Sequence, residues 1–192
     1  MFKKIVVSLS LVVVLSLTGC AKTGNAGQNN AGQNNQVESS EPVDYAAQLE
    51  EINTAVKEAY GENYLANTEI DAATLESVYG ITEDMYDAVI AQGPLMSVHV
   101  DTFIGIHPAE GKKDAVVEAL TAYRDYQINQ AMNYPMNLGK IQASEVKEIG
   151  DYVFFIMLGT TDEMFDTEEE EIAAFQELNQ VAVDAINGVL NK

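Results

Sequence analysis

Cys20 is the residue whose surroundings predict a definite chemistry. It is the only cysteine in the 192-residue chain, and it directly follows Leu17, Thr18 and Gly19. This order of an aliphatic residue, two small residues and a cysteine is the lipobox pattern. The thiol of such a cysteine takes a diacylglyceryl group, and the small residues let a peptidase reach the bond before it. Because a lone cysteine has no disulfide partner, we expect cleavage before Cys20 and lipidation of its sulfur.

Residues 1–19 have the composition of a signal peptide. Lys3 and Lys4 form a positive start, and the apolar run from Ile5 to Leu17 is interrupted only by serines. The run is shorter than the ~20 apolar residues that a membrane-spanning helix needs, and it has the length of a signal-peptide core. We therefore expect a lipoprotein held at the extracytoplasmic face of the cell membrane by acyl chains on Cys20. The alternative is an ordinary secretory signal that ends near a cysteine.

Ser97, His99 and Asp101 form a second group of reactive side chains. They alternate with Val98 and Val100, so a strand would place all three on one face. Side chains two residues apart on a strand lie ~6.6 Å apart, whereas a nucleophile and its base need about 2.6–3.2 Å. We therefore expect no catalytic triad, although a bent strand would shorten the gap. His99 and Asp101 remain the best candidates for contact with a ligand.

The other motifs that could carry chemistry fail on their context. Two histidines, His99 and His107, cannot form a structural zinc site without a free cysteine. The acidic run 162–171 lacks the spacing and central glycine of a calcium loop, which leaves a weak surface calcium site as an alternative. Ser144 and Lys147 match the Ser-x-x-Lys pattern of penicillin-binding enzymes, but Ser144 falls in an expected strand. The sequence therefore predicts no catalytic residue, no metal site and no cofactor.

The chain is strongly acidic. It has 30 Asp and Glu against 10 Lys and Arg, a formal net charge of −20, and loss of Lys3 and Lys4 with the leader would change this to about −22. Such a surface repels nucleic acid and anionic lipid headgroups. We therefore exclude DNA and RNA as partners. We interpret the acidity as a source of solubility and of repulsion between neighbouring molecules at the cell surface. The alternatives are that it serves to bind a cationic partner or calcium.

Composition divides the chain into three parts. The first is the expected signal peptide, residues 1–19. In residues 20–43 the cysteine is followed by a tether in which Ala-Gly-Gln-Asn-Asn occurs twice. Because this polar segment can bury little apolar surface, we expect it to be disordered, with an end-to-end distance of roughly 25 Å. Residues 44–192 are expected to form a single acidic domain.

Helices are expected where apolar residues recur at three-to-four spacing. Four segments have this pattern: 44–60, 71–79, 111–132 and 166–190. Gly61 and Gly80 end the first two. Tyr134-Pro135 ends the third, because proline restricts the residue before it. Thr167 and Glu170 have the spacing of a capping box at the start of the fourth.

Strands are expected at 97–106, 141–148 and 151–159. Gly150-Asp151 predicts a tight hairpin turn between the last two, and the apolar run 152–158 predicts a central strand that is covered on both faces. Residues 82–92 fit either a helix or a strand. The order is two helices, one or two strands, a helix, two strands and a helix. It predicts an α+β domain with an antiparallel sheet of about three to four strands packed with helices.

Several segments together resemble a family of clostridial-type lipoproteins defined as domain of unknown function 4358. The similar region spans roughly residues 71–159. The segments are Gly80-Ile81 with Glu83, residues 94–101, Ala119-Leu120 with Arg124, Tyr134-Pro135 and residues 150–155. The resemblance implies a lipid-anchored domain on Gram-positive anaerobes, and it implies no catalytic residue.

These patterns predict a lipid-anchored module outside the cell that binds a protein or a small molecule and does not turn over a substrate. Two alternatives stay open. One is an enzyme of the cell envelope that uses dispersed carboxylates and His99. The other is a small solute-binding lipoprotein, for which the chain is short. In each case the membrane is reached through the lipid on Cys20.

We predict that Cys20→Ala abolishes incorporation of a fatty-acid probe and releases the protein from the membrane fraction, because the thiol is the only acceptor for the anchor. Metabolic labelling followed by membrane fractionation measures both effects, with the parent protein as the control. A variant that still fractionated with membranes would contradict the predicted anchor.

Overall fold

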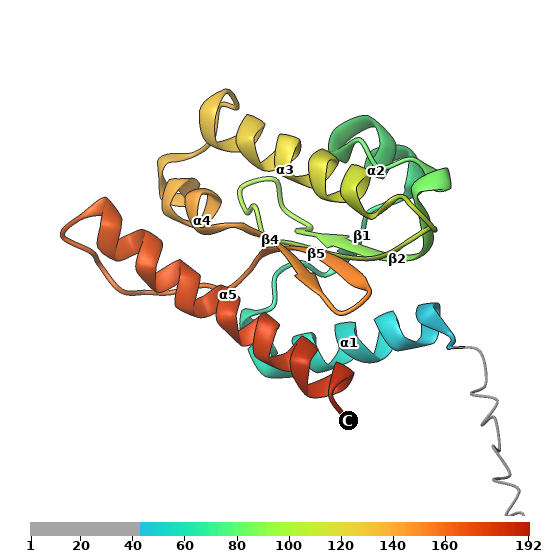
Figure 1. Cartoon of the computed structure of the whole chain (residues 1–192). Coiled ribbons are helices and arrows are strands. Elements are labelled where there is room, and N and C mark those ends of the chain that lie inside the picture. Colours follow the sequence, from blue (N-terminus) through green and yellow to red (C-terminus); the bar gives the residue numbers. More distant parts are fainter. Residues whose placement is uncertain (1–42) are drawn as a thin grey trace, which may run out of the picture. The chain divides into compact units, whose positions relative to one another are not determined.

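A five-stranded antiparallel sheet lies between two layers of helices (Figure 1). The structure is a computed structural model that describes residues 43–192. The strand order is β1-β2-β3-β5-β4. The strands are β1 (Thr68–Glu69), β2 (Tyr86–Gly93), β3 (Thr102–Pro108), β4 (Glu145–Ile149) and β5 (Tyr152–Met157). The helices are α1 (Tyr45–Tyr60), α2 (Ala72–Tyr79), α3 (Lys113–Asn129), α4 (Leu138–Ala143) and α5 (Glu168–Leu190).

Each face of the sheet carries its own hydrophobic core. Phe103 of β3 and Phe154 of β5 point to the side of α1 and α5, where they join Leu49, Ile52, Val56 and Ile186. The next residues along the same strands, Ile104 and Phe155, point to the opposite side and pack with α2 and α3. This is the period of two that a strand imposes on its side chains. Every residue of β3 and of β5 is consequently buried, which confirms a central strand covered on both faces.

The local signals mark the helix ends as expected, except that one bond of the predicted capping box differs. The carboxylate of Asp71 accepts a hydrogen bond from the Thr74 backbone N–H at 2.8 Å at the start of α2. Gly80 follows α2 with a positive φ of 71°, a conformation that glycine adopts without strain. At the start of α5, Thr167 Oγ1 accepts from the Glu170 N–H at 3.2 Å. The Glu170 carboxylate reaches one residue further back than a capping box requires and accepts from the Asp166 N–H at 3.1 Å.

The hairpin of β4 and β5 also follows the expected pattern. Ile149 pairs with Tyr152, so the turn consists of Gly150 and Asp151 alone. Gly150 has a positive φ of 60°, as a two-residue hairpin turn requires. The α+β class and the antiparallel sheet are confirmed, with five strands where three to four were expected.

Two predictions of local structure need correction, and a third, which was left open, is now decided. The strand expected at 97–106 begins only at Thr102, and residues 97–101 form a loop. The strand expected at 141–148 begins at Glu145, because residues 138–143 form the short helix α4. Residues 82–92 combine both alternatives in part, since one 3₁₀ turn at Glu83–Met85 leads into β2. The two-residue strand β1 was not anticipated, and nothing in its two residues marks it as a strand.

The predicted signal peptide, the lipobox of Leu17, Thr18 and Gly19, the lipidated Cys20 and the tether lie outside the described residues. They stay predictions. Among residues 43–192, no helix combines the length and the apolar character that crossing a membrane demands.

Gly105 and Gly188 provide a matched test of the packing. A Cβ atom on Gly105 in β3 would lie 3.0 Å from Phe154 Cε1 and 3.1 Å from Leu49 Cδ2, whereas one on Gly188 in α5 would meet nothing within 4 Å. Gly105→Ala should therefore lower the free energy of unfolding by about 1–3 kcal/mol through overpacking. Gly188→Ala should raise it by up to about 1 kcal/mol, because alanine favours helix. Urea denaturation measures both, and a Gly105→Ala protein as stable as the parent would refute this description of the core.

Candidate functional site

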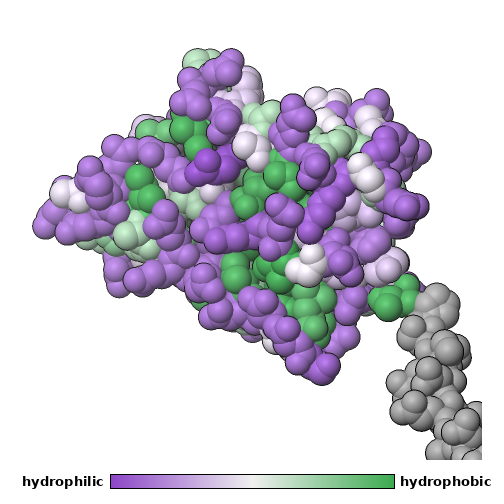
Figure 2. All heavy atoms as spheres, in the orientation of Figure 1, coloured by the Kyte–Doolittle hydropathy of each residue, from purple (hydrophilic) through white to green (hydrophobic). Residues whose placement is uncertain are grey.

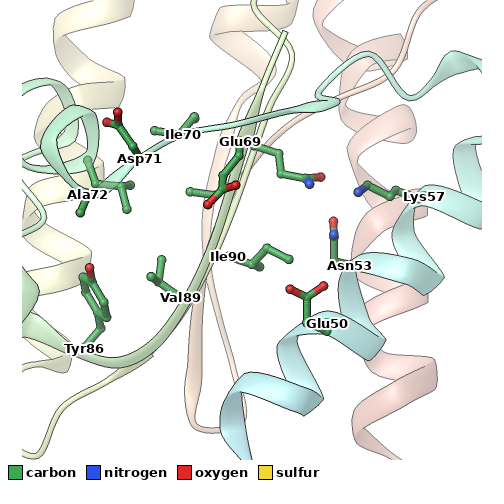
Figure 3. Close-up of a pocket in the computed structure, with 13 residues that line it drawn as sticks. Glu50, Asn53, Lys57, Glu69, Ile70, Asp71, Ala72, Tyr86, Val89 and Ile90 are labelled. Carbon is green, nitrogen blue, oxygen red and sulfur yellow. The ribbon is translucent and has the colours of Figure 1, made fainter. Parts of the chain in front are cut away.

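A hollow of about 380 Å³ lies beside β2, at the point where β1 leaves the sheet. We call it the edge hollow. Figure 3 shows the side chains of α1 on one side of it, the segment from β1 to α2 on the other, and β2 between them. Its lining residues are Glu50, Asn53, Lys57, residues 69–72, Leu75, Tyr86 and residues 89–92.

The edge hollow exists because β1 is much shorter than β2. β1 pairs with β2 only at Gly93 and Gln92. One further hydrogen bond follows, from the Ile70 N–H to the Ala91 carbonyl oxygen at 2.9 Å. Asp71 then caps α2, and the chain turns away from the sheet. Among residues 43–192, no strand therefore pairs with residues 86–90 of β2 on this side.

One face of α1 supplies polar groups to the edge hollow. Glu50, Asn53 and Lys57 follow one another at helical spacing and extend from α1 toward β2 (Figure 3). Asn53 is only 3% exposed, and its Oδ1 accepts a long hydrogen bond of 3.4 Å from the Tyr64 hydroxyl. The same hydroxyl lies 2.9 Å from Gln92 Oε1. Tyr64 thus joins α1 to β2 beneath the polar lining.

The electrostatics of the lining favour positive charge in a ligand. The lining contains three carboxylates, those of Glu50, Glu69 and Asp71, and one ammonium group, that of Lys57. Hydrogen bonds from Thr74 lower the pKa of Asp71, so this carboxylate is charged at neutral pH. The Lys57 ammonium lies 5.8 Å from the centroid of the Tyr64 ring, within the range of a cation–π contact.

The edge hollow has the chemistry of a binding site more than that of a catalytic one. Amide groups from Asn53 and Gln92 can donate and accept hydrogen bonds. The half-buried side chains of Val89 and Ile90 add an apolar surface. No serine, cysteine or histidine is among its lining residues. These groups can hold a polar, positively charged molecule, and they offer no nucleophile paired with a base.

Asp101, one of the two expected ligand contacts, forms a buried ion pair. Its side chain is fully buried, and its Oδ2 lies 2.8 Å from Lys140 Nζ. Lys140 is 5% exposed, and its ammonium lies 5.4 Å from the centroid of the Phe175 ring. Asp101 Oδ1 has no hydrogen-bond partner among residues 43–192. The observed role of Asp101 is therefore structural, and its contact with a ligand stays a prediction.

His99, the other expected ligand contact, lies in the loop before β3. It is half-buried, and its backbone N–H donates to the Met96 carbonyl oxygen at 3.0 Å. Because residues 97–101 are not a strand, Ser97, His99 and Asp101 do not share a strand face. Neither His99 nor Asp101 lines the edge hollow.

His107 lies in β3 among aromatic rings. It stacks on Tyr45 with 3.4 Å between ring centroids, and its Nδ1 is 3.4 Å from Asp87 Oδ2. This setting is that of a packed side chain. Within residues 43–192, no three His, Cys, Asp or Glu side chains gather closely enough to hold a metal ion.

The short helix α4 depends on polar contacts, and the sequence patterns did not indicate them. Arg124 donates through Nε to the Ser144 carbonyl oxygen at 2.6 Å and through Nη2 to that of Gln142 at 3.0 Å. Asn179 of α5 donates to the Ala143 carbonyl oxygen and accepts from the Leu158 N–H, each at 2.9 Å. These bonds satisfy the free carbonyl groups at the end of α4.

A second surface differs from the edge hollow in being apolar. We call it the apolar loop surface. Its exposed side chains come from two segments that are joined by a hydrogen bond of 2.9 Å from Asn137 Nδ2 to the Val98 carbonyl oxygen. The side chains are Leu95, Met96, Tyr134, Met136 and Leu138. On the face drawn in Figure 2, hydrophilic residues predominate and apolar ones form small separate groups.

Comparison with known proteins yields one match. The model of a domain of unknown function, DUF4358, matches residues 59–158, which include β1 to β5 and therefore the strand side of the edge hollow. No curated protein and no solved structure matches the chain.

The edge hollow could have been suspected from one feature of the sequence. Asn53 interrupts the apolar stripe of α1 between Ile52 and Val56, so a polar side chain lies where the core was expected. A buried amide needs hydrogen-bond partners. The position of Glu69 opposite Asn53 has no such local signal, because it depends on the pairing of β1 with β2.

The buried ion pair of Asp101 and Lys140 should make the stability of the fold depend strongly on both residues. Asp101→Asn or Lys140→Met should lower the free energy of unfolding by about 3–5 kcal/mol, because each leaves one buried charge without its partner. The double variant should lose less than the sum of the two. Chemical denaturation of the four proteins gives this coupling directly.

The control for this cycle is the pair of Lys192 and Glu51, which are 2.7 Å apart and more than half exposed. Glu51→Gln should change stability by less than about 1 kcal/mol. An Asp101→Asn protein that lost no more stability than Glu51→Gln would refute the role assigned to the buried pair.

Proposed function

The chain belongs to the DUF4358 family, and we propose that it is a non-enzymatic binding module, held outside the cell by a lipid on Cys20, that binds its partner in the edge hollow. The partner is a protein segment or a small molecule with positive charge. The family adds no activity to this proposal, so the proposal rests on the residues of this chain.

The observation that carries the proposal is the amide of Asn53. It lies on the lining of the edge hollow at 3% exposure, and its Nδ2 group makes no hydrogen bond with another residue in the range 43–192. Its one contact is the long bond from Tyr64 to Oδ1. Among the described residues, the buried side-chain atoms that lack a partner are Asp101 Oδ1 and His107 Nδ1. The Nδ2 group of Asn53 therefore keeps contact with solvent and is free to donate a hydrogen bond to a ligand in the edge hollow.

The charges around the edge hollow are consistent with this role. Glu50 and Glu69 are exposed and form no ion pair within the described residues, so both are available to a cationic partner. The alternative of an enzyme has less support. That alternative relies on dispersed carboxylates and His99. Asp101, the carboxylate two residues from His99 in the sequence, forms an ion pair with Lys140.

We predict that a photo-crosslinking amino acid at position 69 captures a cell-envelope partner in intact cells, because Glu69 lines the edge hollow. The matched control is the same substitution at Glu177, an exposed glutamate of α5 outside this site. Mass spectrometry of the adducts identifies the partner, and Cys20→Ala in the same cells shows whether anchoring is needed for the encounter.

Two outcomes would contradict the proposed site. The first is the same set of adducts from positions 69 and 177, which indicates random collision. The second is adducts from Met136 of the apolar loop surface with none from position 69, which would place binding on that surface.

A further inference from the structure

We infer that the edge hollow takes an extended peptide segment that carries lysine or arginine, and that this segment adds to the free edge of β2 as a strand. The inference rests on the proposed function and narrows its partner to one chemical class. The guest strand would pair with β2 beyond the point where β1 ends.

The backbone of β2 is set up for such pairing. The Ala91 carbonyl oxygen points to the side of β1, since it accepts from the Ile70 N–H at 2.9 Å. In an antiparallel pair, the groups that point to one side recur at every second residue. Val89 therefore directs its N–H and C=O to the same side as Ala91. The described residues include no strand that meets Val89 there.

The middle of this edge carries no protecting charge. Natural sheets usually guard an edge strand with charged side chains, a bulge or a covering element. The opposite edge, β4, has such charges in the ion pairs of Lys147 with Glu145 and of Lys113 with Glu148, at 3.2 and 3.1 Å. The free part of β2 has one exposed charge, Asp87, and a bulge at its far end, between Tyr86 and Ala88. Between that end and β1 it has the uncharged, half-buried Val89 and Ile90.

The length of the free edge sets the length of the guest. The register of β2 with β3 shifts between Tyr86 and Ala88, and such a bulge ends regular pairing. The bond from Ile70 to Ala91 limits the other end. A guest of about three to four residues, or roughly 10–13 Å, fits between these limits. The edge hollow provides the space beside β2 that the guest would occupy.

Charge complementarity decides which peptide fits. Glu69 pairs with Gln92, and Gln92 pairs with Phe103, so Glu69 lies on the face of the sheet that α1 covers, as does Glu50. Lys57 is the one basic residue in the lining. Lysine or arginine side chains on alternate residues would meet these carboxylates. A second copy of this chain is a poor occupant, because each copy has a formal charge of −20 and the two would repel.

The test uses the purified full chain and the pentapeptide Val-Lys-Val-Lys-Val, acetylated and amidated at its ends. Calorimetry measures affinity, and NMR measures exchange of the Val89 amide hydrogen with solvent. We expect the peptide to bind and to slow this exchange by more than about tenfold, because the guest carbonyl accepts from the Val89 N–H. The same peptide with Glu for Lys, or with its alternate amides N-methylated, should bind at least about tenfold more weakly.

Two variants test the site from the protein side. The double variant Glu50→Gln and Glu69→Gln should weaken binding about tenfold or more, with Glu177→Gln as the matched control. Val89→Pro removes the backbone N–H of residue 89, which points to the free side of β2. An edge strand tolerates proline at such a position. The variant should therefore not bind the peptide. Circular dichroism checks its fold. If it does not fold, the N-methylated peptide tests the same hydrogen bonds.

Other outcomes would overturn the inference in distinguishable ways. Binding that leaves Val89 exchange unchanged, or spermidine binding as tightly as the peptide, would indicate a site for small cations and not strand addition. Equal binding of the Lys and Glu peptides would refute the role of charge. If none of these probes bound, the inference would fail, and adducts at position 69 in cells would show separately whether the chain is a binding module.

Discussion

Burial of two strands on both faces is the constraint on which this fold depends. All of β3 and β5 is buried, so α1 and α5 must cover one face of the sheet and α2 and α3 the other (Figure 1). Neither face then offers space for a ligand. The backbone groups of the sheet keep access to solvent only at its edges.

The same burial explains the polar interior at one end of the sheet. Asp101 lies directly before β3 and is enclosed by the cores, so its charge needs a buried partner. Lys140 of α4 supplies it at 2.8 Å. Arg124 and Asn179 bind the carbonyl groups at the end of α4. A helix of six residues has little stability of its own, and these long-range polar contacts hold it in place.

The edge hollow arises from a mismatch in length between neighbouring strands. β2 extends over Tyr86–Gly93, while β1 accompanies it for two residues and one further hydrogen bond. The turn into α2 leaves backbone groups of β2 open, and α1 faces them with Glu50, Asn53 and Lys57. A free strand edge, a buried amide and an excess of carboxylates thus meet in one place, which is the physical basis for the proposed binding role.

The sequence by itself determined the features that depend on neighbours along the chain. Helices α1, α2 and α5, the Gly150-Asp151 turn and the doubly covered β5 follow from periodicity and end signals, and the lipobox before Cys20 is a prediction of the same local kind. Only the tertiary structure decided the start of β3 at Thr102, the helix α4 and the edge hollow. Each of these depends on partners far apart in sequence: Asp101 with Lys140, and Glu69 with Gln92. Pairings of this kind arise from how the two cores close around the sheet, and no local pattern of residues records them.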